Sequence, residues 1–151
     1  MSKSYNNSVD PHYILEKFSC EAVRYYLCSV SYYGVDMNFF EPAMVLMHNS
    51  ELKDVLGNLI HRGLNLAHKY CGGVVPDCPH DPASGLPFDL NKLVSDVETA
   101  MVNCDVKTAI DKTMEVVRET NKWLTAAAPW KLKAEEAARY DYNVQKGFEL
   151  P

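Results

Sequence analysis

Two polar residues one helical turn apart, Asn58 and Arg62, carry side chains suited to reading nucleic-acid bases. Asparagine and arginine both hydrogen-bond to base edges, and arginine also stacks on bases. Both belong to a polar stripe that recurs every three or four residues, the spacing of one helix face. The stripe consists of Asp54, Asn58, Arg62, Asn65 and Lys69. A solvated helix face carries the same pattern, so the stripe alone does not define a binding site.

A third candidate, Trp130, directly follows Pro129 at an expected helix break. An indole held there and left exposed is a stacking platform for a base, worth about 1–3 kcal/mol. A buried core position is the ordinary alternative for a tryptophan. If the helices that carry them are neighbours, Asn58, Arg62 and Trp130 can converge on one extruded base. Three lysines are available for phosphate contacts: Lys122, Lys131 and Lys133.

One long helix must position the first two residues. Apolar residues recur at helical spacing between 51 and 70, which predicts one stripe turned to a core. The helix is expected to begin at Glu41 and to end near Tyr70, because Gly72-Gly73 is a stop signal. Shorter helices are expected from Asp10-Pro11 and over residues 21–30, joined to the long helix by an irregular connection over 31–40.

The second half of the chain also has a helical pattern. Four prolines between residues 74 and 87 exclude a helix there, and the apolar periodicity returns at Asp89. Asp105 is placed to cap a further helix, which ends at Ala128 because the next residue is proline. A weaker helix is expected over 131–145. The pattern predicts an all-α, antiparallel helical bundle with a short helical preface.

The overall charge limits the kind of nucleic-acid contact. The 151 residues carry a formal charge of −5, which argues against a protein that coats nucleic acid through bulk charge. Any such contact must be local and geometric. The five cysteines include no CxxC pair, which favours a reduced, cytosolic compartment. No apolar run approaches the roughly 20 residues of a membrane span.

A cluster of possible metal ligands lies after the long helix. His68, Cys71, Cys78 and His80 are chemically suited to zinc. Their spacing is not that of a standard zinc knuckle, so it favours a structural role, and we expect no metal site. No Ser-His-Asp set or pair of carboxylates stands out.

Several motifs together resemble one enzyme family. Met1-Ser2-Lys3-Ser4 and then Val9-Asp10-Pro11 resemble the Lys-Met-Ser-Lys-Ser loop of class I aminoacyl-tRNA synthetases from its second residue onward. Residues 21–27, EAVRYYL, are similar to the helix that follows that loop. The later motifs resemble methionyl-tRNA synthetases, particularly the eukaryotic cytosolic type: Leu56-Gly57-Asn58 with Arg62, Gly72-Gly73, Asn121 and Pro129-Trp130-Lys131. The resemblance covers roughly residues 1–133.

The resemblance implies a division of the chain and roles for its residues. Residues 1–40 would be the tail of a catalytic domain, and residues 41–151 a helical anticodon-binding domain truncated at its C-terminal end. The CAU anticodon of methionine tRNA would be recognised by Asn58, Arg62, Pro129 and Trp130, with Trp130 stacked on its first base. Lys3 would belong to the loop that stabilises ATP phosphates. The parent enzyme joins methionine to tRNA using ATP and Mg²⁺.

The departures from the family pattern define what this chain is not expected to do alone. The nucleotide-binding Rossmann domain and the methionine pocket are absent from this sequence, so Lys3 is expected to be idle. Asn6 stands where the family usually has glycine. The expected partners are tRNA(Met) and the remainder of the synthetase, with no membrane or DNA. A free-standing tRNA-binding module acting in trans and a helical protein-interaction domain remain alternatives. An exposed Trp130 near Arg62 would favour RNA binding over the interaction domain.

Overall fold

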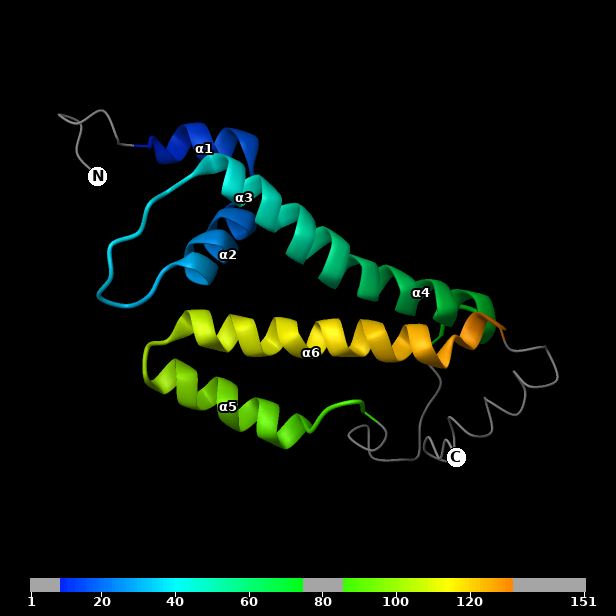
Figure 1. The fold of residues 1–151 in the computed structure, drawn as a ribbon. Helices are drawn as coiled ribbons and strands as arrows, with labels where there is room; N and C mark the ends of the chain where they lie inside the picture. The colour runs from blue at the N-terminus through cyan, green and yellow to red at the C-terminus, as the bar shows by residue number, and fades with distance from the viewer. Residues whose placement is uncertain (1–8, 75–85, 132–151) are drawn as a thin grey trace.

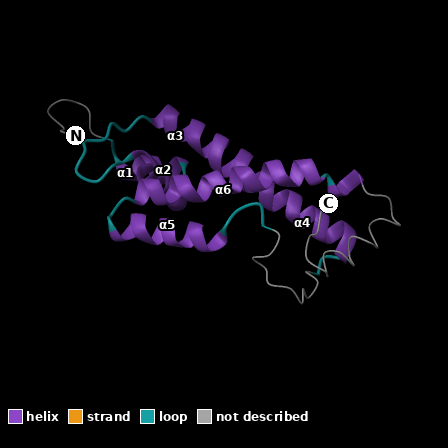
Figure 2. Ribbon diagram, turned by 60° about the horizontal axis from the view of Figure 1, so that its bottom comes forward, coloured by secondary structure: helices purple, strands orange, loops and turns teal. Residues whose placement is uncertain are grey.

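The computed structural model describes residues 9–74 and 86–131. Every regular element in these two ranges is a helix, which confirms the predicted all-α fold (Figures 1 and 2). The expectations for Lys3, Lys133 and the final helix lie outside the described residues, as do those for Cys78 and His80. Within the described ranges, no helix combines the length and the hydropathy that a transmembrane segment requires.

Two short helices, α1 (Pro11–Lys17) and α2 (Cys20–Val30), form the preface. Asp10 caps α1 by accepting a hydrogen bond from the His12 backbone N–H at 2.9 Å, and proline occupies the first turn. Both helices pack against the start of the long helix. The buried side chains of this small core are Ile14, Ala22, Tyr26 and Met44.

The long helix is continuous from residue 41 to residue 71, but its winding changes twice. It comprises α3 (Glu41–Met47), the π-helix η2 (His48–Gly57) and α4 (Asn58–Cys71). Gly72 ends it in the left-handed conformation, with φ of +61°, as the stop signal predicted. The predicted start and end are therefore confirmed. The π-helical middle was not expected, because π-helices are rare and usually extend over a single turn.

The second half forms an antiparallel hairpin of α5 (Leu90–Val102) and α6 (Val106–Ala127). Asp105 accepts from the Thr108 backbone N–H at 3.1 Å and so caps α6 as predicted. Ala128 then takes a positive φ of 41°, and the chain turns into the 3₁₀ helix η3 (Pro129–Lys131).

Helix α6 is the central element of the described bundle. It packs against α5 on one side and against α2, η2 and α4 on the other (Figure 1). The expectation that a stripe of residues 51–70 faces a core is only partly right. No residue of η2 or α4 is buried, and Ile60 is 52% exposed. The reason is geometric: this part of the long helix meets α6 along one edge only, so its apolar residues are half-covered.

Candidate nucleic-acid interface

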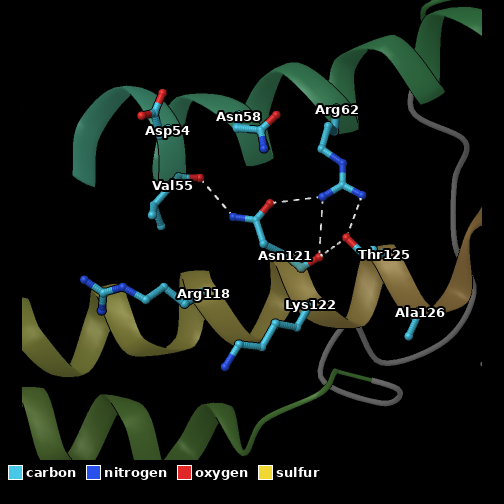
Figure 3. A pocket seen from close by; sticks show the side chains of 9 residues that line it. All are labelled: Asp54, Val55, Asn58, Arg62, Arg118, Asn121, Lys122, Thr125 and Ala126. Carbon is cyan, nitrogen blue, oxygen red and sulfur yellow. Dashed lines mark hydrogen bonds between the residues drawn. The ribbon is translucent and has the colours of Figure 1, made fainter. Parts of the chain in front are cut away.

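A cavity of about 590 Å³ lies between the long helix and α6, and we call it the α4–α6 cavity. Figure 3 shows Asn58 and Arg62 on the long helix facing the C-terminal half of α6. The walls consist of Asp54, Val55, Asn58, Arg62, Arg118, Asn121, Lys122, Thr125 and Ala126.

The guanidinium of Arg62 crosses from α4 to α6. Its Nη2 donates to the Thr125 hydroxyl oxygen at 3.0 Å. Its Nη1 makes two longer contacts of 3.4 Å with Asn121, one to the backbone carbonyl and one to the side-chain oxygen. The Thr125 bond is therefore the tighter of these contacts. The arginine side chain is fixed at its far end by two residues one turn apart on α6.

Asn121 continues this network to the long helix. Its side-chain N–H donates to the backbone carbonyl of Val55 at 2.9 Å, and Val55 lies in the π-helical segment (Figure 3). One amide thus contacts η2 through its nitrogen and Arg62 through its oxygen.

Trp130 lies at the end of this network. It sits in η3, directly after Pro129, and is 41% exposed. The Cζ atom of Arg62 lies 5.1 Å from the centroid of its ring, within the range of a cation–π contact. We call Arg62, Asn121, Thr125 and Trp130 the Arg62 cluster. The structure brings Arg62 and Trp130 together, as expected from the sequence, and leaves the indole partly open to solvent.

The remaining candidates lie around this cluster. Asn58 is exposed and projects from the long helix into the same space as Arg62. Lys122 lines the cavity but projects away from Arg62 in Figure 3, and Lys131 is exposed in the turn that carries Trp130. Asn58 and Lys122 therefore line the same cavity, whereas Lys131 lies next to Trp130 in η3.

The cavity carries more positive than negative charge although the chain is acidic. Arg62, Arg118 and Lys122 line it, against Asp54 as the one acidic wall residue. Arg118 forms an ion pair with Glu51 of η2, and this hydrogen bond raises the pKa of the guanidinium further. The Asp54 carboxylate forms an ion pair with the neighbouring Lys53, with Oδ1 3.5 Å from Nζ, and both side chains are exposed. Among the described residues, Arg62 and Lys122 are thus the cationic wall residues without an ion pair to a carboxylate, and they carry the local positive charge expected of an acidic protein that contacts an anion.

Sequence reasoning missed two residues of this site. Arg118 and Thr125 were not candidates, and Asn121 entered only through the family resemblance. Arg118, Lys122 and Thr125 are spaced by four and three residues, so they share a face of α6. The spacing argument that selected Asn58 and Arg62 would have found this second face too.

The possible metal ligands remain untested as a group. Among residues 9–74 and 86–131, no three His, Cys, Asp or Glu side chains are grouped closely enough to hold a metal ion. His68 and Cys71 lie at the end of α4, and the other two residues of the sequence cluster are outside the described ranges.

Comparisons with known proteins show what this chain is similar to. Residues 1–64 match the family described as tRNA synthetases class I (M). The chain is 33% identical over 145 residues to the Methionine–tRNA ligase of Halalkalibacterium halodurans, covering 92% of this chain and 22% of that protein. The Methionine–tRNA ligase of Enterococcus faecalis is 34% identical over 144 residues, covering 92% and 21% respectively. That of Deinococcus radiodurans is 33% identical over 141 residues, covering 87% and 20%.

These similarities make Methionine–tRNA ligases homologues of this chain over most of its length. The chain spans about a fifth of the length of these relatives. The three relatives are bacterial, so the narrower expectation of a eukaryotic cytosolic type stays a prediction.

Proposed function

We propose that this chain is the tRNA-binding part of a cytoplasmic methionyl-tRNA synthetase and that it recognises the CAU anticodon of methionine tRNA. The observation that carries the proposal is the half-exposed Trp130, over whose ring lies Arg62, a wall residue of the α4–α6 cavity. In this proposal residues 1–40 are the tail of the catalytic domain and residues 41–151 are the anticodon-binding domain. The homology to Methionine–tRNA ligases supports the choice of RNA.

The geometry supports a division of labour within the site. The indole offers a π surface for one unstacked base, and Arg62 and Asn58 supply polar groups for base edges. Lys122 and Lys131 supply charge for phosphates, and so would Lys133, which lies outside the described residues; such contacts position the RNA without reading its sequence. Pro129 fixes the backbone entry to the turn that carries the indole, because its ring restricts φ.

The ligation reaction belongs to the proposal for the parent enzyme. There, methionine would be joined to tRNA with ATP and Mg²⁺, and Lys3 would contribute to the loop that stabilises the ATP phosphates. The remainder of the synthetase would supply the nucleotide-binding domain. This chain alone is expected to give no ATP–pyrophosphate exchange, and clear exchange activity would overturn this division of the enzyme.

A free-standing tRNA-binding module that acts in trans with a separate catalytic chain is the second candidate. It would use the same site, so the exposed Trp130 beside Arg62 favours both RNA-binding hypotheses over a protein-interaction domain.

The experiment is a binding titration at fixed salt with two anticodon stem-loops, one with CAU and one with a changed first base. Trp130→Ala should weaken binding of the CAU stem-loop by about 1–3 kcal/mol. Arg62→Ala should weaken binding and also reduce the discrimination between the two stem-loops. Lys133→Ala should weaken both about equally, because a phosphate contact carries no sequence information.

Tyr33→Ala is the matched control for removal of an exposed aromatic side chain. Tyr33 is 87% exposed in the loop between α2 and α3, at the opposite end of the bundle from the Arg62 cluster (Figure 1). Its loss should leave both affinities unchanged. If Trp130→Ala folds and binds the CAU stem-loop as the wild type does, the anticodon site is wrong and the interaction domain gains support.

A further inference from the structure

The Thr125 hydroxyl can only accept a hydrogen bond from Arg62, because its single hydrogen is already donated elsewhere. Its O–H donates to the Asn121 backbone carbonyl at 2.8 Å, within α6. The hydroxyl has one hydrogen to donate, so its free lone pairs can only accept. The 3.0 Å contact from Arg62 Nη2 uses that acceptor. The helix itself therefore orients Thr125 as an acceptor for the guanidinium.

The orientation of the Asn121 amide follows from its two partners. The Val55 backbone carbonyl can only accept, so the amide nitrogen must face it, as the 2.9 Å contact requires. The amide oxygen then faces the other way, toward Arg62. A guanidinium has donors and no acceptor, so the oxygen is the atom that can pair with it.

These two side-chain acceptors, together with the Asn121 backbone carbonyl 3.4 Å from Nη1, hold one edge of the planar guanidinium. A guanidinium that is hydrogen-bonded along one edge keeps a defined plane, and its face is then available for an aromatic ring. Trp130 lies beside the guanidinium held in this way, with Arg62 Cζ over the indole at 5.1 Å from the ring centroid. The guanidinium covers one face of the indole, so an incoming base is restricted to the other.

We infer that Asn121 and Thr125 are positioning residues that fix the guanidinium of Arg62, and through it the indole of Trp130, before any RNA binds. The inference rests on the proposed function for its consequence, which is a site with one preset stacking face. Side chains that are already ordered lose less conformational freedom on binding, and this improves affinity without a new contact.

The first test needs no RNA. The chain has two tryptophans, so Trp123→Phe leaves Trp130 as the single fluorophore. In this background, acrylamide quenching and emission anisotropy report how freely the indole moves. Arg62→Ala gives the reference quenching and anisotropy for an indole without the guanidinium over its ring. Thr125→Val and Asn121→Leu should shift both readouts toward those reference values, and Thr125→Ser, which keeps the hydroxyl, should restore the starting values.

Thr120→Val is the matched control. Thr120 also lies on α6 and its hydroxyl donates to the Val116 backbone carbonyl at 2.8 Å, but none of its hydrogen bonds reaches Arg62. It has the same type of helix contact as Thr125 without the arginine. Its replacement should leave the fluorescence of Trp130 unchanged.

The second test measures affinity for the CAU stem-loop without the Trp123→Phe background. Thr125→Val should weaken binding by about three- to tenfold, the scale of one net hydrogen bond. Thr125→Ser and Thr120→Val should bind as the wild type does.

The outcomes separate the two proposals. If Thr125→Val and Asn121→Leu leave the Trp130 signal as in the parent, or if Arg62→Ala itself leaves it unchanged, the positioning role is wrong. If the signal shifts as expected but the wild type does not bind the stem-loop, the positioning role stands and the anticodon proposal fails.

Discussion

The side-chain amide of Asn121 donates a hydrogen bond to the backbone carbonyl of Val55 across 2.9 Å. The contact joins a side chain of α6 directly to the main chain of the π-helical segment. It therefore ties the two walls of the α4–α6 cavity together at a point that does not depend on the rotamer of any residue in η2. Farther along the same two helices, Arg62 of α4 donates to Thr125 of α6. The guanidinium of Arg62 also lies over the ring of Trp130.

Two glycines of the long helix should respond in opposite ways to alanine. A Cβ at Gly57 would lie 3.0 Å from the backbone carbonyl oxygen of Leu52, which cannot move without disturbing η2. A Cβ at Gly63 would meet nothing within 4 Å. Gly57→Ala should therefore lower the free energy of unfolding by about 1–3 kcal/mol, as overpacking does. Gly63→Ala should raise it by about 0.5–1 kcal/mol, because alanine favours a helix interior.

Urea unfolding followed by circular dichroism measures both changes, and each glycine is the control for the other. Equal stabilisation by the two substitutions would show that residues 52–57 are wound as an ordinary α-helix.

The preface core should depend on Met44. This side chain is 1% exposed and packs with Ile14, Ala22 and Tyr26. Met44→Ala should destabilise the protein by about 2–5 kcal/mol, through lost burial and the cavity left behind. Met101, at 52% exposure, is the matched control, and Met101→Ala should change the stability by less than about 0.5 kcal/mol. Thermal unfolding compares the two, and similar small effects would contradict a core centred on Met44.

The contribution of Lys122 to RNA binding should be electrostatic. If it contacts one phosphate, Lys122→Ala should reduce the slope of log affinity against log salt by about 0.7. The loss should be the same for CAU and for a changed anticodon. Lys92, exposed on α5, is the control for the removal of a lysine outside the cavity. An unchanged slope in Lys122→Ala would remove this residue from the phosphate contacts.

The stability of α6 should fall in acid through Asp105. Hydrogen bonds from the side chain and the backbone N–H of Thr108 hold the pKa of Asp105 below its ordinary value of 3.8. Because the folded-state pKa is the lower one, folding favours the carboxylate. This contribution is fully present above about pH 4 and is lost as the pH falls through the folded-state pKa.

Asp105→Asn tests this directly, since asparagine also caps a helix but does not titrate. The wild type should have the higher melting temperature near pH 6, and the difference should shrink on going to about pH 2. A difference that stays constant with pH would contradict the charged cap.

The sequence predicted the ends of the helices better than their winding or burial. Asp10, Asp105 and Gly72 are local signals, and each acts on the few backbone groups beside it. The π-helical winding of residues 48–57 has no such local signal, and the apolar spacing of three to four residues that predicted the long helix is the spacing of an α-helix. The exposure of Ile60 was missed because it depends on how many neighbours the helix has, which a single helix does not encode.

The candidate site was predicted in the same partial way. Arg62 and Trp130 were selected for their chemistry, and their contact follows from the parallel, side-by-side placement of α4 and α6 (Figure 1). Thr125 was missed because a threonine on a helix face has no distinctive chemistry until an arginine from another helix reaches it.

The π-helical segment also sets the phase of the long helix. A backbone that closes its hydrogen bonds over five residues turns less per residue than one that closes them over four. Met44 holds α3 in the preface core. The winding of the ten residues of η2 therefore determines in which direction each side chain of α4 points. If η2 rewound as an α-helix, Met44 would stay in place while Arg62 rotated away from Asn121, Thr125 and Trp130. The winding of η2 thus fixes how α4, which carries Arg62, is rotated relative to α3, which carries Met44.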